Sequence, residues 1–343
     1  FLRDYFRSNR KMGSTDRRIA AQCVYSFFRL GKTIAAKTIE ERIAVGIFLS
    51  AETPDSFYSW LVKNHSRITD EISDEHIQSK LGVVKKLYPD YSVQDTFPFA
   101  EFLSAEISAE DFTLSMLRQP KTWLRLRKEF RNKTLNEFEE KKISFNTLEG
   151  SDAVEIQGKV RLDELESFRR GYFEIQDLSS QRTAKYFSPN PNESWWDTCA
   201  GSGGKSLLLA GLESSVKIFA TDTRESILLN LSQRFKRAGV RDFKTKAINL
   251  ESGLLASDEM FDGIIVDAPC TGSGTWARSA EWLSNFNWKQ IADYSGKQKK
   301  IVRNVLGNLK VNAPLIYITC SVFRQENEDN IKYSAENLGL SSE

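Results

Sequence analysis

The chain has 343 residues, 40% of them hydrophobic and 27% charged, and a formal net charge of only +2, which predicts a globular protein of two or three domains. No stretch is long and apolar enough to cross a bilayer, and residues 1–10 lack a signal-peptide pattern. The four cysteines have no CxxC spacing, which excludes a typical zinc site and a secreted disulfide framework. We therefore expect a reduced, cytoplasmic protein without a metal.

Residues 1–115 are predicted to be helical. Strand-like alternation is absent there, and apolar residues recur at intervals of three and four, as at Ile19, Cys23 and Phe27. Residues 116–165 change character: short alternations around Leu124 and Val160 suggest strands, and a Glu/Lys-rich stretch near 135–142 suggests a helix. We interpret this part as a small mixed connector.

Basic residues are unevenly distributed. Ten Lys or Arg stand among the first 42 residues against four acids, and residues 118–133 hold seven, including Arg125, Arg127 and Lys128, against one acid. Such clusters suit a phosphate backbone, whereas a solvated helix face is the alternative.

Strand and helix patterns alternate from residue 166 to 343. Strands are predicted at 195–199, 216–221, 243–248, 261–266 and 315–319, with helices at 206–212, 225–238, 288–309 and 327–338. This alternation predicts an α/β fold with a doubly wound parallel sheet. The unusual residues follow the strands, at the edge where such sheets bind ligands.

The first motif is Asp197-Thr-Cys-Ala-Gly-Ser-Gly-Gly-Lys205, between a strand and a helix. Its glycines allow a ligand to approach the backbone, and Asp222, at the end of the next strand, could bind two ribose hydroxyls. Together they suggest an adenosine-containing cofactor; a purely structural tight turn is the alternative. A phosphate-binding loop at Gly204-Lys205-Ser206 would make the chain an NTPase, but Cys199 stands where that loop needs glycine.

Two further motifs carry cysteines. Asp267-Ala-Pro-Cys-Thr-Gly-Ser-Gly274 and Thr319-Cys-Ser321 each follow an apolar strand. In the common strand order 3-2-1-4-5 these strands are neighbours, about 4.8 Å apart, so Cys270 and Cys320 are expected to face one pocket beside Asp267. A single cysteine is more often a small buried hydrophobe, but three of four falling on strand-end motifs weakens that alternative.

These motifs together resemble the Sun/Fmu family of RNA 5-methylcytosine methyltransferases, also called RsmB-like or NOP/NSUN. Gly171-Tyr-Phe-Glu-Ile-Gln-Asp-Leu-Ser-Ser-Gln181 is similar to the lead-in of that family's catalytic domain, and Arg17-Arg18 with Tyr25-Ser-Phe-Phe-Arg29 resembles its NusB-like domain. The resemblance implies three parts. They are a NusB-like RNA-binding domain at 1–115, a connector at 116–165, and a Rossmann-like class I methyltransferase domain at 166–343.

The chain departs from the family pattern at three places. Ser202 stands where the family usually has proline, and Arg278-Ser-Ala-Glu281 replaces a frequent Arg-x-Pro-Asp run. The family's sheet normally continues with a final hairpin, so we expect the last strands of the domain to be missing from this sequence.

The resemblance implies a monomeric enzyme that methylates carbon 5 of cytosine in rRNA or tRNA with S-adenosylmethionine. It implies Cys320 as covalent nucleophile, Cys270 in proton removal and product release, Asp267 at the ring, and Lys205 orienting the base or the cofactor. It places the cofactor against Cys199, Ala200, Gly201, Ser202, Gly203, Gly204, Lys205, Asp222, Asn249 and Asp267. A non-catalytic RNA-binding protein would need neither Cys270 nor Cys320, and a DNA methyltransferase would use the Pro-Cys cysteine as nucleophile.

Overall fold

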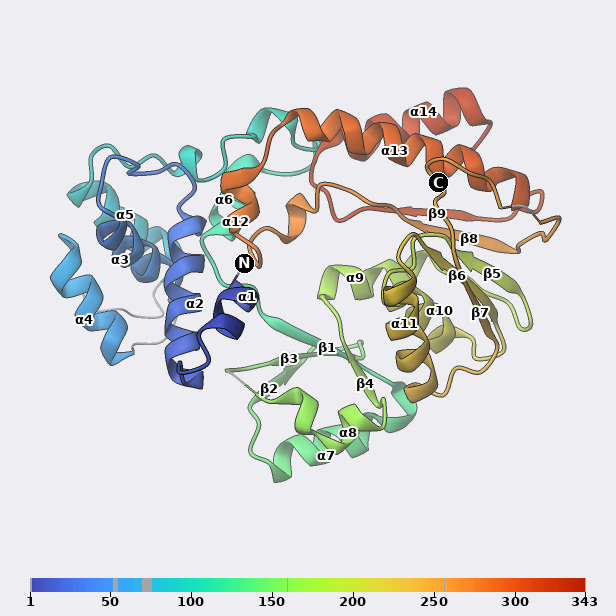
Figure 1. Ribbon diagram of the computed structural model, residues 1–343, viewed down its shortest axis with the longest axis horizontal. Coiled ribbons are helices and arrows are strands. Elements are labelled where there is room, and N and C mark those ends of the chain that lie inside the picture. Colours follow the sequence, from blue (N-terminus) through green and yellow to red (C-terminus); the bar gives the residue numbers. More distant parts are fainter. Residues whose placement is uncertain (1, 52–54, 70–75, 159, 256, 343) are drawn as a thin grey trace. The chain divides into compact units, whose positions relative to one another are not determined.

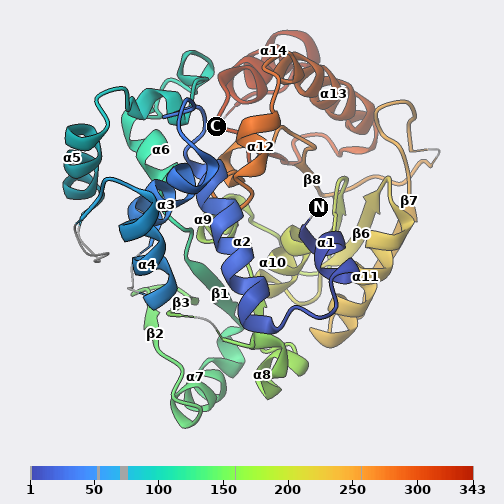
Figure 2. The same ribbon diagram turned by 60° about the vertical axis from the view of Figure 1, so that its left-hand side comes forward.

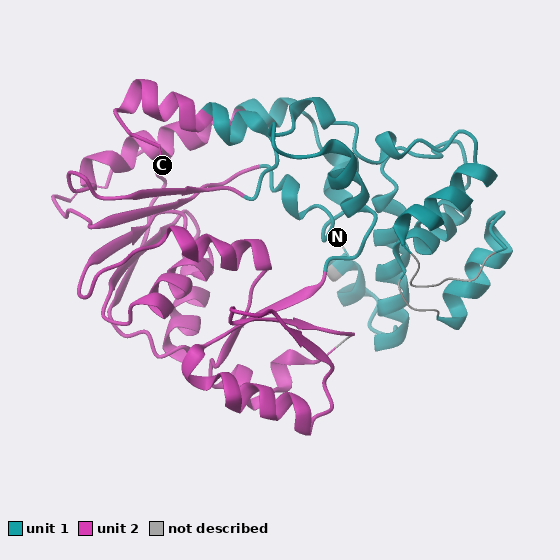
Figure 3. Ribbon diagram, turned by 180° about the vertical axis from the view of Figure 1, so that it is seen from behind, with its two compact units in different colours: residues 1–120, 271–292, 320–329 teal, residues 121–270, 293–319, 330–343 magenta. Residues whose placement is uncertain are grey.

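The computed structural model describes residues 2–51, 55–69, 76–158, 160–255 and 257–342. The chain forms two compact units, shown in different colours in Figure 3. Unit 1 comprises residues 1–120, 271–292 and 320–329, and unit 2 comprises residues 121–270, 293–319 and 330–343. In the part of the chain that the structure describes, no helix has the length and apolar character needed to cross a membrane.

Unit 1 is mainly helical, as predicted for the N-terminal region. Its helices are α1 (Leu2–Ser8), α2 (Ser14–Arg29), α3 (Ile39–Ser50), α4 (Ser56–His65), α5 (Ile77–Leu87), α6 (Ala109–Met116) and α12 (Glu281–Asn285). Helix α3 is the centre of its core, because every residue from 44 to 50 is buried. The side chain of Thr38 begins this helix by accepting a hydrogen bond from the backbone N–H of Glu41.

A second, aromatic core in unit 1 joins three segments that lie far apart in the sequence. Phe97, Trp276 and Phe323 are each almost completely buried in it. The rings of Phe97 and Phe323 stack with centroids 6.3 Å apart. The segments that follow the two cysteine motifs are therefore packed into the core of unit 1.

Unit 2 contains a small antiparallel sheet with the strand order β2-β3-β1-β4. Its elements are β1 (Thr122–Leu126), α7 (Arg131–Glu140), β2 (Phe145–Thr147), β3 (Ala153–Ile156), α8 (Glu166–Arg169) and β4 (Phe173–Ile175). The predicted strand near Leu124 and the helix near 135–142 are present. The strand expected near Val160 is wrong: the strand lies at 153–156, and Leu162 begins a 3-10 turn.

The second sheet of unit 2 has five parallel strands in the order β7-β6-β5-β8-β9. The strands are β5 (Ser194–Asp197), β6 (Lys217–Asp222), β7 (Phe243–Ala247), β8 (Gly263–Asp267) and β9 (Leu315–Ile318). The helices are α9 (Leu178–Arg182), α10 (Gly204–Leu212), α11 (Glu225–Arg237), α13 (Lys289–Val305) and α14 (Glu328–Leu338). This is the predicted order 3-2-1-4-5, and it confirms the α/β fold.

Helices cover both faces of this sheet, as Figures 1 and 2 show. Because successive side chains of a strand point to opposite faces, Trp195 and Trp196 enter different cores. Trp195 packs with residues of α10 and α11, whereas Trp196 packs with residues of α13. The doubly wound arrangement leaves the carboxyl ends of the strands available for a site.

Candidate active site and cofactor loop

Three aspartates end three neighbouring strands of the parallel sheet. Asp197 ends β5, Asp222 ends β6 and Asp267 ends β8. Register pairs Asp267 with Ile318 of β9, so the strands that lead to the two cysteine motifs are adjacent. The structure thus brings the first motif, Asp222 and Asp267 to one edge of the sheet, as the sequence predicted.

The loop between β5 and α10 depends on its glycines. Gly201 and Gly203 have φ angles of +52° and +84°, which residues with a side chain rarely adopt. A Cβ atom on Gly203 would also lie 2.7 Å from Cε1 of Phe235 in α11. A Cβ on Gly201 would meet nothing within 4 Å, so this side of the loop is open.

Asp222 holds the loop and has capacity for a further donor. Its Oδ2 accepts the backbone N–H of Gly201 at 3.0 Å, and its Oδ1 accepts the backbone N–H and Nε–H of Arg224 at 3.0 and 3.2 Å. A carboxylate offers about four lone-pair sites, so these three donors leave room for one hydroxyl group. Together with the open side of Gly201, this fits the ribose of an adenosine cofactor.

Lys205 and Asp267 form an ion pair at the end of β8. The Lys205 Nζ lies 3.0 Å from Asp267 Oδ2, and the lysine side chain is 10% exposed against 34% for the aspartate. The pair fixes the direction of the Asp267 carboxylate while leaving part of it accessible. Lys205 is therefore engaged with protein in this structure, which does not favour a phosphate-binding role.

Burial controls the protonation of two groups under this loop. Burial raises the pKa of the Cys199 thiol to about 12, so Cys199 is a neutral thiol near pH 7 and a poor nucleophile. Burial also raises the pKa of Asp197 to about 7. Its Oδ2 accepts the hydroxyl of Ser206 at 2.6 Å, whereas its buried Oδ1 has no hydrogen-bond partner.

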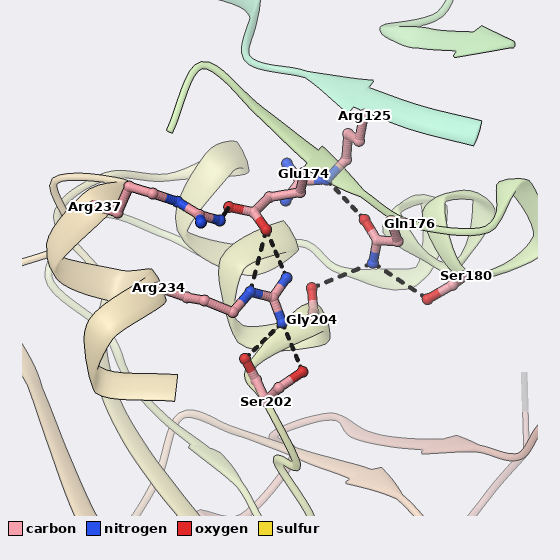
Figure 4. A network of polar contacts seen from close by, with 8 residues as sticks. All are labelled: Arg125, Glu174, Gln176, Ser180, Ser202, Gly204, Arg234 and Arg237. Atoms are coloured by element: carbon pink, nitrogen blue, oxygen red, sulfur yellow. Dashed lines mark hydrogen bonds and ion pairs between the residues drawn. The ribbon is translucent and has the colours of Figure 1, made fainter. Parts of the chain in front are cut away.

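Glu174 of β4 connects the small sheet to the loop between β5 and α10, as Figure 4 shows. It accepts hydrogen bonds from Arg234 at 2.6 and 3.2 Å and from Arg237 at 3.1 Å. Arg234 also donates to both the carbonyl oxygen and the Oγ of Ser202, each at 2.7 Å. Ser202 thus accepts a side-chain hydrogen bond that a proline at this position could not.

Gln176 provides a second connection between the same parts (Figure 4). Its Oε1 accepts from Arg125 Nε at 2.8 Å, and its Nε2 donates to the carbonyl oxygen of Gly204 at 3.3 Å. Burial lowers the pKa of Arg125 to about 10. Arg127 donates to the carbonyl oxygen of Ala238 and pairs with Glu129.

These contacts bear on the basic cluster at 118–133. Arg125 is engaged by Gln176 and shielded by burial, so it is not part of an exposed surface for RNA, whereas the side chain of Arg127 is 28% exposed. Lys128 and Lys133 are exposed, as a phosphate-binding surface requires.

Cys270 and Cys320 follow adjacent strands but are assigned to different units. Cys270 is half-buried in unit 2, and Cys320 is exposed in unit 1. Gln298 of α13 donates to the carbonyl oxygen of Pro269 at 3.0 Å and so anchors the peptide before Cys270. The backbone N–H of Gly274 donates to the carbonyl oxygen of Cys320 at 2.8 Å. A common pocket for the two thiols stays a prediction.

Asn249 lies just beyond β7. It is exposed, and its Oδ1 accepts the backbone N–H of Glu251 at 3.0 Å. Its contact with an adenine stays a prediction.

Sequence reasoning missed Glu174, Gln176 and Gln298 as residues that hold the site. For Glu174 and Gln176, the only signal was their place within the segment 171–181.

Comparisons with known proteins identify relatives of this arrangement. Residues 184–338 match the family model described as 16S rRNA methyltransferase RsmB/F. Ribosomal RNA small subunit methyltransferase B of Salmonella paratyphi A is 30% identical over 183 residues, which is 53% of this chain and 42% of that protein. The chain therefore spans about two fifths of the length of the curated relatives it matches.

Solved structures share the fold. A methyltransferase homolog from Pyrococcus horikoshii is 26% identical with a TM-score of 0.60, over 72% of this chain and 79% of that one. The protein PH0851 is 21% identical with a TM-score of 0.72, over 99% of this chain and 85% of that one. The second likeness concerns the fold alone.

Proposed function

We propose that the chain is a member of the RsmB/F methyltransferase family, whose model residues 184–338 match, and that it methylates carbon 5 of cytosine in RNA with S-adenosylmethionine. The observation that carries the proposal is the pair between Lys205 of α10 and Asp267 at the end of β8, beside the strand that leads to Thr319-Cys-Ser321. An acidic group for the ring and two thiols for addition and elimination are what this reaction requires.

The loop from Cys199 to Lys205, with Asp222, Asn249 and Asp267, would hold the cofactor. The fit rests on the open side of Gly201 and the unused acceptor capacity of Asp222. When bound, S-adenosylmethionine supplies a methyl group activated by its sulfonium charge. Asp222 would accept from the ribose, and Asn249 would approach the adenine.

Cys320 would act as the nucleophile. Carbon 5 of cytosine is a poor nucleophile, and a thiolate bond to carbon 6 converts the ring into an enamine whose carbon 5 is reactive. The thiolate is the attacking species, so the site must favour loss of the thiol proton. Cys320 is exposed, which suits attack on a base that arrives from outside.

Asp267 and Cys270 would complete the reaction. Asp267, oriented by Lys205, would donate a proton to N3 as the Cys320 thiolate adds to carbon 6, so that the ring stays neutral, and would take the proton back before the thiolate leaves. After carbon 5 gains the methyl group, Cys270 would remove the carbon 5 proton as a base. The electrons of that C–H bond restore the C5–C6 double bond, and the Cys320 thiolate leaves.

The proposed substrate is a cytosine in rRNA or tRNA that is single-stranded or turned out of its helix, because a stacked ring does not expose carbon 6 to a thiol. The helical region at 1–115, proposed to be NusB-like, would contribute to RNA binding. Lys128 and Lys133 in the connector would contact phosphates.

An activity measurement tests the proposal. The protein is incubated with total RNA and S-adenosylmethionine carrying a labelled methyl group, and the modified positions are mapped by bisulfite sequencing. We expect label in 5-methylcytosine that disappears with Cys320→Ala. Binding of ATP without binding of S-adenosylmethionine would instead support the NTPase interpretation and overturn the proposal.

A further inference from the structure

Glu326 is a completely buried acidic side chain close in sequence to Cys320. It ends the 3-10 turn Arg324–Glu326 and has 0% exposure. Burying a carboxyl group is costly unless hydrogen bonds replace those it made to water. Its partners therefore indicate why the residue is placed there.

The partners of Glu326 are the residues that immediately follow the two cysteines. Thr271, next to Cys270, donates its backbone N–H to Oε2 at 3.0 Å and its hydroxyl to Oε1 at 2.5 Å. Ser321, next to Cys320, donates its hydroxyl to the same Oε1. One carboxyl group thus binds the first residue of each segment that continues from a cysteine.

Ser273 completes this cluster. Its Oγ accepts the backbone N–H of Val322 at 2.9 Å and lies 3.2 Å from the Oγ of Ser321. Since the Ser321 hydroxyl proton goes to Glu326, the Ser273 hydroxyl can donate to the Ser321 Oγ. That oxygen also accepts the backbone N–H of Phe323 at 3.1 Å. These donors and acceptors are consistent with one arrangement of hydroxyl protons.

A backbone contact joins the same two segments. Gly274 donates its N–H to the carbonyl oxygen of Cys320. A Cβ atom on Gly274 would lie 2.8 Å from that oxygen, so any side chain here would displace the Cys320 peptide. All members of this arrangement, from Thr271 to Gly274 and from Cys320 to Glu326, belong to unit 1.

We propose that Glu326 is a positioning residue that fixes the Cys270 and Cys320 segments relative to one another for the two steps of the reaction. The inference rests on the proposed function, because it assigns both thiols to one cytosine. Glu326 is buried and acts through Thr271 and Ser321, so it does not touch substrate. Errors of about 1 Å in placing reacting groups cost on the order of a hundredfold in rate, so such a clamp matters for catalysis.

The test compares Glu326→Ala and Glu326→Gln with Glu106→Ala, which replaces an exposed glutamate of unit 1. Single-turnover methyl transfer, the Kd for S-adenosylmethionine and the melting temperature are measured for each. We expect Glu326→Ala to lower the single-turnover rate about a hundredfold. Its affinity for S-adenosylmethionine should stay within about twofold, since the loop at 199–205 belongs to unit 2 and Glu326 belongs to unit 1. Glu326→Gln, which keeps one acceptor oxygen, should recover part of the rate.

A second readout does not depend on catalysis. Iodoacetamide labelling followed by mass spectrometry gives the alkylation rates of Cys270, Cys320 and Cys23, the last being an internal standard in α2. Glu326→Ala should raise the rate at Cys270 and alter that at Cys320, with Cys23 unchanged. If the wild-type protein methylates no RNA but these rates change, the proposed function fails while the clamp stands.

Gly274→Ala keeps the test decisive if Glu326→Ala does not fold. It disturbs the same two segments from the other side and should give the same slow transfer with unchanged cofactor affinity. The proposal is overturned if either folded variant transfers methyl groups at the wild-type rate with the wild-type alkylation pattern. The proposal is also overturned if the decrease in the single-turnover rate of a variant is fully explained by a smaller fraction of folded protein.

Discussion

Replacing Glu174 tests whether the small sheet stabilises the loop between β5 and α10, where we propose that the cofactor binds. The Glu174 side chain is 5% exposed, and its two arginine partners are 22% and 23% exposed. Glu174→Gln removes the negative charge that both guanidinium groups share while keeping nearly the same shape. Arg234 then loses the carboxylate that directs it toward Ser202.

The expected loss in the free energy of unfolding depends on how deeply the ion pairs of Glu174 are buried. Breaking a buried ion pair by removing one partner costs about 3–5 kcal/mol, whereas an exposed pair contributes about 0–1 kcal/mol. Glu174 is buried and its partners are partly buried, so we expect Glu174→Gln to lower the free energy of unfolding by about 3 kcal/mol. Arg125 carries a third positive charge that Glu174 attracts and Arg234 repels. Removing the charge of Glu174 leaves this repulsion uncompensated, which further lowers the free energy of unfolding.

Urea unfolding gives the free energy, and calorimetry gives the affinity for S-adenosylmethionine. Glu166→Gln is the matched control, because the Glu166–Arg170 pair is exposed at 58% and 60% and the substitution should leave the free energy of unfolding almost unchanged. We expect Glu174→Gln also to weaken cofactor binding, since Ser202 lies in the loop. A loss below about 1 kcal/mol, equal to that of the control, would refute this reasoning.

Three other predictions concern the same unit. Burial raises the pKa of Asp197 to about 7, whereas a carboxyl group in the unfolded chain has a pKa of about 4. The contribution of Asp197 to the free energy of unfolding is therefore complete below about pH 4. It is lost as the pH rises through 7, by up to about 4 kcal/mol. Urea unfolding of Asp197→Asn between pH 5 and 8 should show a flatter profile, and an identical profile would contradict the assignment. Gly203→Ala should destabilise the fold by about 1–3 kcal/mol in the same assay, through its clash with Phe235; an unchanged midpoint would count against this packing. Lys128→Ala with Lys133→Ala should reduce the salt dependence of RNA binding by roughly 0.7 per lost phosphate contact; an unchanged slope would mean that the two lysines only face solvent.

The strand-end motifs could be predicted because their signals are local. An apolar run followed by Asp267 or Cys320 indicates a buried strand and its end within a few residues. Once the five strands were located, the order 3-2-1-4-5 that is common in such folds was enough to predict which strands are neighbours. The strand misplaced near Val160 shows the limit of this approach, since short alternations also occur in loops and turns.

The supporting contacts could not be predicted because they join residues distant in sequence. Gln176 lies 51 residues from Arg125, Arg234 lies 60 from Glu174, and Glu326 lies 55 from Thr271. Counting charges along the chain made Arg125 part of an RNA surface, because its partner is invisible locally. Only the tertiary structure shows which charges are already satisfied.

The central claim is that two thiols perform different steps, and trapping of a protein–RNA adduct tests it most directly. Each variant is incubated with S-adenosylmethionine and substrate RNA and run on a denaturing gel. Cys270→Ala should add Cys320 to the ring, complete methyl transfer and stall before elimination, so a covalent conjugate accumulates. Cys320→Ala and the double variant should form none. A conjugate with Cys320→Ala but not with Cys270→Ala would reverse the roles, and active single variants that trap no RNA would contradict the covalent mechanism.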